Sequence, residues 1–195
     1  MKTIMIIGAG QSQLPLIQSA KREGYHTIVC DLDPKAPGTT LADEYCQVST
    51  KDRRGLLEAA KRKHINGIVA NSEYAMCDVA HIASELKLIG NREEAVEKLS
   101  SKFKFRLLQK RIGLFTPSFL QDDSADHIEG KLAFPILIKP DESSGSRGIL
   151  QISAPDFEAI QESIQKCKMI SRNQKAIIEE YIPLASQTVI EGEVF

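Results

Sequence analysis

The chain has 195 residues, of which 42% are hydrophobic, and 25 basic and 26 acidic residues give it a formal net charge of −1. A chain of this size can bury a sizeable core in one large or two small domains. The near-neutral balance provides no global field toward nucleic acid or an anionic membrane, and no stretch is long and apolar enough to span a bilayer. Four scattered cysteines without a C-x-x-C pair argue against a zinc site or a disulfide framework. We expect a reducing, cytoplasmic setting.

The first half of the chain alternates β-rich runs with amphipathic helical segments. Strands are expected at residues 3–7, 27–31 and 67–71, and helices at residues 13–24, 56–64 and 75–86. Strands that alternate with helices of this length are typical of an α/β domain with a parallel, doubly wound sheet.

A charged helical stretch over residues 92–113 leads to a different pattern. Strands are expected at residues 134–139, 148–152, 176–182 and 188–195, with a helix that starts near Asp156. This order indicates an α+β arrangement with antiparallel pairing, and hence a second domain. The boundary is placed near residue 95, which gives domains of residues 1–95 and 96–195. Because the chain stops inside a strand-like run, we expect it to be a fragment of a longer protein.

The first expected strand is followed by a glycine-containing turn, GAGQSQ, at residues 8–13. A dinucleotide-binding fingerprint would occupy this place, and Asp31 ends the second strand at a suitable distance. However, Gln13 stands at the third glycine position, where a side chain would crowd the packing of helix on strand. A tight turn, or a turn that lines a pocket for a small substrate, is therefore favoured over NAD or FAD binding.

Open α/β sheets bind ligands at the carboxyl ends of their strands. Gly10, Gln11 and Glu73 follow such strand ends and are candidate substrate residues. Glu73 stands near the start of a helix, so stabilisation of the helix dipole is an equally good interpretation of its carboxylate as recognition of a substrate amine.

The apolar run FPILIK, residues 134–139, ends in a lysine. Alternation places Leu137 and Lys139 on one face of the expected strand and Ile136 and Ile138 on the other. A lysine on so apolar a strand is costly unless an anion or a carboxylate meets it.

Small residues follow this lysine: Ser143, Ser144, Gly145, Ser146 and Gly148. They would allow successive backbone N–H groups to turn toward one ligand, which is how a phosphate nest is formed. The lysine and the loop together indicate a polyphosphate site. The loop is not a Walker A motif, because the lysine precedes the glycines and no G-K-[ST] closes it. A hairpin turn with a surface lysine is the alternative.

Together these segments resemble the ATP-grasp superfamily over nearly the whole chain. Residues 1–95 resemble the N-terminal pre-ATP-grasp domain of biotin carboxylase and carbamoyl-phosphate synthase in GAGQSQLPLI, GYHTIVCDLDPKAPG, the aspartate of ADEY, and GNREEAVEKLSSK. Residues 96–195 resemble the first part of the ATP-grasp domain in KFKFRLLQKRIGLFTP, FPILIKP, SSGSRGI and IIEEYI. The resemblance implies a Rossmann-like parallel sheet followed by an incomplete α+β ATP-grasp domain.

The resemblance also implies an ATP site. Lys139 would hold the phosphates, and the loop from Ser143 to Gly148 would fold over them as a flap. Lys102, at the head of the helix KFKFRLLQK, would reach the phosphates as a second cation. A solvated place in a cluster of basic side chains is the alternative for Lys102.

The segment IIEEYI would be the hinge strand beside the adenine and would contribute Glu179, Glu180, Tyr181 and Ile182. The implied contacts to the base are the carbonyl of Glu180 and the N–H of Ile182. The family often shows a glycine, one more residue and a ribose-binding glutamate after the hinge. Residues 184–186 read LAS instead, so no ribose contact is assigned.

For the parent protein the resemblance implies an ADP-forming carboxylate–amine ligase. ATP phosphorylates a carboxylate and an amine attacks the acyl phosphate, so that an amide or peptide bond forms. The segments GSRGI and NSEYA favour the amino-acid-ligating branch, although biotin-type carboxylases and purine-pathway enzymes share most of these parts. The family's Mg²⁺ ligands, a pair of acids with an asparagine, would lie beyond Phe195. We therefore expect this chain to be weakly active or inactive alone.

Two other functions remain open: a non-catalytic nucleotide-binding or regulatory domain, and an oxidoreductase that uses the glycine turn. The expected partners are a small carboxylate and a small amine, with no nucleic acid and no membrane, and a homodimer is left open. Cys77 and His81 lie one helical turn apart, but such a pair is more often packing than a metal site, so no metal ligand is assigned.

Overall fold

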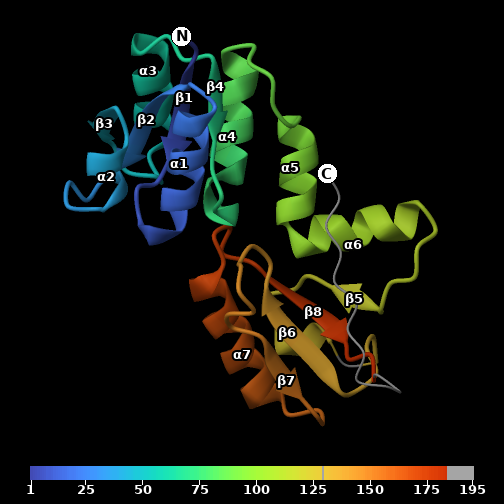
Figure 1. Ribbon diagram of the computed structural model, residues 1–195. Coiled ribbons are helices and arrows are strands. Elements are labelled where there is room, and N and C mark those ends of the chain that lie inside the picture. Colours follow the sequence, from blue (N-terminus) through green and yellow to red (C-terminus); the bar gives the residue numbers. More distant parts are fainter. Residues whose placement is uncertain (129, 184–195) are drawn as a thin grey trace. The chain divides into compact units, whose positions relative to one another are not determined.

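The computed structural model describes residues 1–128 and 130–183, and its contacts divide the chain into two compact units that meet between Ser100 and Ser101. The sequence placed this boundary near residue 95. Each unit has its own four-stranded sheet (Figure 1). Within the described residues, no helix is long and apolar enough to cross a membrane.

The first unit is built on a parallel sheet with strand order β3-β2-β1-β4. Its strands are β1 (Thr3–Ile7), β2 (His26–Asp31), β3 (Glu44–Gln47) and β4 (Gly67–Val69). Its helices are α1 (Leu14–Arg22), α2 (Gly38–Leu41), α3 (Arg53–Arg62), α4 (Glu73–Glu85) and α5 (Glu93–Ser100). The expected parallel, doubly wound sheet is confirmed.

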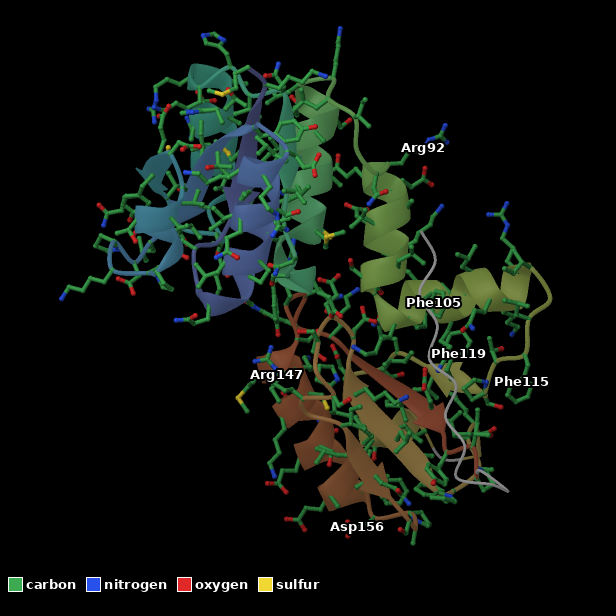
Figure 2. All side chains as sticks on the ribbon, viewed as in Figure 1. Arg92, Phe105, Phe115, Phe119, Arg147 and Asp156 are labelled. Atoms are coloured by element: carbon green, nitrogen blue, oxygen red, sulfur yellow. The ribbon has the colours of Figure 1, made fainter. Side chains whose placement is uncertain are left out.

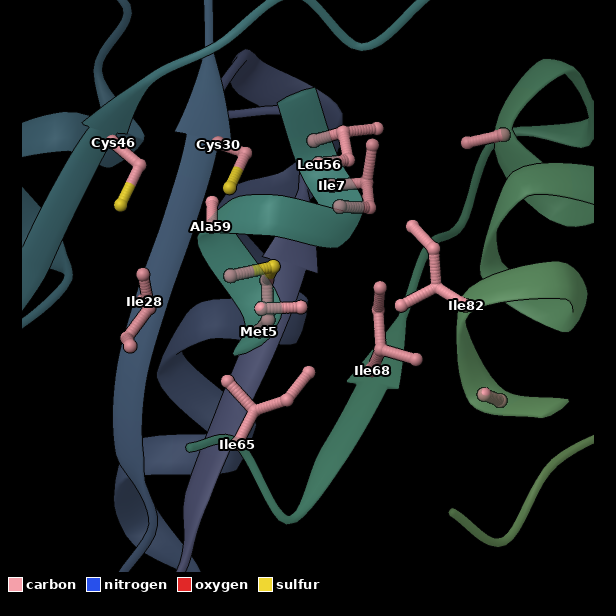
Figure 3. Close-up of a cluster of buried hydrophobic side chains, with 13 residues drawn as sticks. Met5, Ile7, Ile28, Cys30, Cys46, Leu56, Ala59, Ile65, Ile68 and Ile82 are labelled. Carbon is pink, nitrogen blue, oxygen red and sulfur yellow. The ribbon is translucent and has the colours of Figure 1, made fainter. Parts of the chain in front are cut away.

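Helices cover both faces of this sheet. Successive residues of β1 point to opposite faces and therefore enter two different cores. Met5 and Ile7 enter one core together with Leu56 of α3 and Ile82 of α4 (Figure 3). Ile6 enters a second core that includes Ile17 and Ala20 of α1. Helices on both faces leave the carboxyl edge of the sheet as the place where the loops gather.

Two cysteines lie directly opposite each other on neighbouring parallel strands, Cys30 on β2 and Cys46 on β3 (Figure 3). Both are free and buried. Burial, followed by the influence of Cys46, raises the pKa of Cys30 to about 12. The thiol therefore remains protonated and behaves as a core side chain.

The second unit contains an antiparallel sheet with strand order β5-β8-β6-β7. Its strands are β5 (Phe119–Leu120), β6 (Ile136–Pro140), β7 (Leu150–Ile152) and β8 (Ala176–Glu180), and its helices are α6 (Lys102–Arg111) and α7 (Phe157–Ile170). Asp156 caps α7 by accepting from the N–H of Ala159 at 3.0 Å (Figure 2). This is the expected α+β arrangement. The strand expected at residues 188–195 lies outside the described residues.

The faces of β6 differ as the alternation predicts. Ile136 and Ile138 are fully buried in a core with Ile160 and Ile164 of α7. Leu137 and Lys139 are half-buried on the other face. On that side the ring of Phe103 from α6 packs edge-on against Phe119 of β5, with ring centroids 5.7 Å apart.

The helical stretch expected over residues 92–113 is divided at Ser101 into two helices, α5 and α6, and α6 begins at Lys102, which the sequence analysis placed at the head of its helix. The side chain of Ser101 accepts a hydrogen bond from the N–H of Lys104 at 3.1 Å and so starts a new helix. The short strands β3 and β5 were not expected either. Both lie at sheet edges and carry no long apolar run.

The core of the second unit gives a direct stability test. Replacing the buried Ile138 with alanine is expected to lower the free energy of unfolding of this unit by about 2–5 kcal/mol, because it removes buried apolar atoms and leaves a cavity. Ile112→Ala is the matched control, since Ile112 is 60% exposed. Urea unfolding of each variant, monitored by hydrogen exchange of the β6 and β8 amides, measures the two losses of unfolding free energy. Equal losses in the two variants would contradict the assigned core.

Candidate functional site

Lys139 extends from β6 to a buried carboxylate on the neighbouring strand. Its Nζ lies 2.6 Å from Oε2 of Glu179, and the two side chains are 15% and 3% exposed. Glu179 pairs with Leu137 across the ladder, which places it on the same sheet face as Lys139. The requirement that an anion or a carboxylate meet this lysine is therefore satisfied by the protein itself.

Arg106 of α6 binds the same carboxylate from the other side. Its Nε donates to Oε1 of Glu179 at 2.7 Å and its Nη2 donates to Oε2 at 3.3 Å. Burial by itself would raise the pKa of Glu179, but the hydrogen bonds and charges of Arg106 and Lys139 outweigh it and hold the pKa below its usual range. Two cations thus share one carboxylate, so the group keeps an excess of one positive charge.

Lys102 points at the start of the small-residue loop. Its Nζ donates to the carbonyl oxygens of Pro140 and Ser143, at 3.0 Å each, and lies 3.4 Å from that of Asp141. It also lies 3.3 Å from the hydroxyl oxygen of Ser143. The structure therefore places Lys102 beside the loop that the sequence linked to phosphates, in contact with the loop's own backbone.

Asp141 is a residue of this region that the sequence reasoning missed. Its side chain is buried, and Oδ1 accepts from the N–H of Phe103 at 2.7 Å. Oδ2 accepts from the hydroxyl of Ser101 at 2.8 Å and from the amide of Asn173 at 2.6 Å. A carboxylate at the amino end of α6 is favourably placed in the helix dipole. Asp141 thus fixes the start of α6 against the start of the loop.

The loop between β6 and β7 contains three residues in the left-handed region: Gly145 (φ +67), Ser146 (φ +53) and Gly148 (φ +76). A Cβ at Gly148 would lie 2.7 Å from Cδ1 of Ile170 and 2.9 Å from Cγ of Pro140. Glycine is therefore required at 148 by both conformation and space. Left-handed residues of this kind are the ones that turn successive N–H groups toward one side of a loop.

The proposed hinge residues lie at the end of β8 and beyond it. The N–H of Glu180 donates to the carbonyl of Ser118 at 3.0 Å, and its carboxylate accepts from the N–H of Ala133 at 2.9 Å. The side chains of Tyr181 and Ile182 are 37% and 43% exposed. The acidic side chains are thus engaged within the protein, and the base contacts through the carbonyl of Glu180 and the N–H of Ile182 remain predictions.

In the first unit the glycine turn is held by the side chain of its own Gln13 and by side chains at the end of β2 and just after β4. The N–H of Ala9 donates to Oδ2 of Asp31 at 2.8 Å. Nε2 of Gln13 donates to Oδ1 of Asn71 at 2.6 Å, and a Cβ at Gly8 would lie 3.1 Å from Cδ of Gln13. The glutamine side chain therefore lies against the turn, which favours the tight-turn interpretation over a dinucleotide fingerprint. The contact with Asn71 brings the segment after β4 beside the turn after β1, as expected at the carboxyl edge of the sheet.

The candidate substrate residues lie at the same edge of the first sheet. Gly10 and Gln11 follow β1, and Glu73 follows β4, the neighbouring strand. Glu73 is exposed in the first turn of α4, so its position suits both the helix dipole and a substrate amine.

Cys77 and His81 have separate partners. The Cys77 thiol lies 3.6 Å from the hydroxyl of Ser100, and Nδ1 of His81 lies 3.0 Å from a carboxylate oxygen of Glu93. Across residues 1–128 and 130–183, no group of three or more His, Cys, Asp or Glu side chains could hold a metal ion.

Comparison with known proteins adds the family. The model of the ribonucleotide synthetase preATP-grasp domain matches residues 1–97. Residues 1–97 therefore match a preATP-grasp domain, which is the domain that the resemblance to the ATP-grasp superfamily predicted for this part of the chain. A curated relative is the formate-dependent phosphoribosylglycinamide formyltransferase of Bacteroides thetaiotaomicron, which is 24% identical over 197 residues, 97% of this chain and 50% of that protein.

Solved structures share the fold of this chain. N5-carboxyaminoimidazole synthetase from Staphylococcus aureus, complexed with ADP, has a TM-score of 0.73 at 20% identity and covers 93% of this chain and 48% of its own. L-amino acid ligase from Bacillus licheniformis has a TM-score of 0.73 at 20% identity and covers 93% of this chain and 44% of its own. At these identities the likeness shows the fold. The chain spans about half the length of the formyltransferases it matches.

The lowered pKa of Glu179 predicts a pH dependence of stability. The folded protein binds fewer protons at this carboxyl than the unfolded chain does, so the contribution of Glu179 is present above its ordinary pKa and is lost as pH falls through the lowered value. Between pH 7 and about pH 3 the wild type should therefore lose more unfolding free energy in the second unit than Glu179→Gln does. Urea titrations at both pH values measure this.

Glu158→Gln is the control for this prediction, since Glu158 is exposed on α7. It should keep the wild-type loss on acidification. The same loss in Glu179→Gln as in the wild type would show that Glu179 is not the residue responsible.

Proposed function

We propose that this chain forms the ATP-binding portion of an ATP-grasp ligase that activates a carboxylate as an acyl phosphate for attack by an amine. The observation that carries the proposal is the hairpin of β6 and β7. It presents a largely buried lysine, Lys139, and continues into a loop with left-handed residues at 145, 146 and 148. A cation beside such a loop is the combination that suits a polyphosphate.

The residues present suit a nucleotide in charge. The group of Arg106, Lys139 and Glu179 has one positive charge in excess, which favours an anion near Lys139. ATP would supply the phosphoryl group. Lys139 and the loop of residues 143–148 would bind and orient its phosphates, and the segment Glu179–Ile182 would lie beside the base. Fixed cations and backbone N–H groups suit this task, since phosphoryl transfer depends mainly on positioning and charge neutralisation.

Lys102 supports this site in our proposal by holding the loop. Its ammonium contacts the carbonyl oxygens at the loop's beginning, so it fixes the end from which the flap would close. For Lys102 to reach the phosphates as well, as the resemblance implies, it would exchange one of these contacts for a phosphate oxygen.

The acceptor side of the proposed reaction is assigned to the first unit. Gly10, Gln11 and Glu73 lie at the carboxyl edge of the parallel sheet, where small ligands bind in open α/β folds. The exposed carboxylate of Glu73 suits an amine. Small-molecule carboxylate and amine substrates, Mg²⁺ held by residues outside this sequence, and a cytoplasmic setting belong to the same proposal.

Lys139→Ala tests the proposed role of the lysine. ATP affinity is expected to fall at least about tenfold, equivalent to about 1.4 kcal/mol, because a charge-assisted contact to phosphate is lost. Isothermal calorimetry with ATP measures the change. Lys131→Ala removes an exposed lysine of the same unit and should leave the affinity unaltered. Unchanged affinity in Lys139→Ala would count against the phosphate role, and ADP release in the presence of carboxylate and amine would separate a ligase from a nucleotide-binding domain.

A further inference from the structure

Two cationic side chains, each from a different element, share one buried carboxylate on a third element. Arg106 comes from α6, Lys139 from β6 and Glu179 from β8. Lys139 takes only Oε2 of Glu179, at 2.6 Å. Arg106 takes Oε1 at 2.7 Å and also reaches Oε2 at 3.3 Å. Lys139 and Arg106 therefore both contact Oε2, while Oε1 is contacted by Arg106 alone.

This unequal sharing decides what happens when an anion approaches Lys139. The anion must displace Glu179 from the ammonium, and a carboxylate that is 3% exposed cannot turn to water for a new partner. A buried charge that loses its only partner is strongly destabilised. Arg106 removes this difficulty, because its guanidinium donates to both oxygens of the carboxylate and can keep both contacts when Lys139 leaves.

The guanidinium is itself held in place. Its Nη1 donates to Oε1 of Gln109 at 2.7 Å, one turn further along the same helix. Nη1 binds Gln109, and both Nε and Nη2 point toward Glu179. These contacts fix the orientation of the guanidinium plane relative to α6. The arginine is therefore positioned to hold the carboxylate and is not directed at the place where a ligand of Lys139 would bind.

We propose that Arg106 is a positioning residue for nucleotide binding: it retains Glu179 when Lys139 changes partner from that carboxylate to a nucleotide phosphate. Glu179 is accordingly the counter-ion of Lys139 when no nucleotide is bound. Arg106 determines how easily the ion pair between Glu179 and Lys139 is broken. This inference rests on the proposed function, because it requires that ATP binds at Lys139.

The test is a double-mutant cycle on ATP affinity, measured by calorimetry on the full chain. Arg106→Gln should weaken ATP binding about tenfold, because Glu179 is then left with Lys139 as its only partner. Glu179→Gln should bind ATP at least as tightly as the wild type. In the Glu179→Gln background, Arg106→Gln should change the affinity by less than about threefold, since no carboxylate remains to be held.

Arg111→Gln is the matched control, an arginine that is exposed at the end of the same helix. It should bind ATP as the wild type does, which separates the role of Arg106 from a general loss of positive charge. Circular dichroism checks that each variant is folded. If Arg106→Gln is not folded, Arg106→Lys replaces it, because lysine keeps the charge but cannot bind both oxygens as a fork. A smaller loss, again abolished by Glu179→Gln, is then expected.

Two results would overturn the inference while leaving the proposed function intact. One is an ATP affinity in Arg106→Gln equal to that of the wild type. The other is an equal loss on replacing Arg106 with and without Glu179, which would mean that the arginine acts on the nucleotide independently of the carboxylate. The failure of the proposed function is distinct, since the wild-type chain itself would then bind no ATP, and the inference would fall with it.

Discussion

The second unit depends on one buried carboxylate that two cations share. Glu179 lies on β8, a central strand of the sheet, and joins Lys139 of the neighbouring strand to Arg106 of α6. A buried charge is tolerated only when it is paired and hydrogen-bonded, so these contacts fix the register of the pairing and the position of the helix together. The same arrangement keeps a lysine ammonium at the sheet surface in a folded chain without any bound anion.

None of the residues of helix α6 is fully buried, and polar contacts hold the helix at several points. At its beginning, the N–H of Phe103 donates to Asp141, and the Lys102 ammonium donates to carbonyl oxygens at the start of the loop. One turn later Arg106 binds Glu179. All of these contacts lead to β6, β8 or the loop between β6 and β7. The helix, the lysine and the loop therefore form one electrostatically connected group, and a change in the partner of one side chain affects the others.

Local periodicity was sufficient to predict part of this arrangement. The alternation in FPILIK correctly placed Ile136 and Ile138 on one face and Lys139 on the other, because side-chain direction in a strand alternates with position, and the structure shows that the isoleucine face is the core. The partners of these residues were not predictable in the same way. Glu179 is 40 residues from Lys139 and 73 from Arg106, and Asp141 is 38 from Phe103, separations at which no local pattern carries information. The edge strands β3 and β5 were missed because they bury little.

A shared counter-ion also bears on which anions Lys139 would accept. Displacing Glu179 costs a buried, charge-assisted hydrogen bond, which an anion with a single charge and few contacts repays poorly. A polyphosphate brings several charges and can be met at the same time by the backbone of the left-handed loop that follows Lys139 in the chain. Competition by Glu179 would therefore lower the affinity of Lys139 for every anion. The net affinity would remain highest for a ligand that binds both Lys139 and the loop that follows it. On this argument selectivity for a nucleotide comes from the cost of freeing the lysine as much as from the contacts made afterwards.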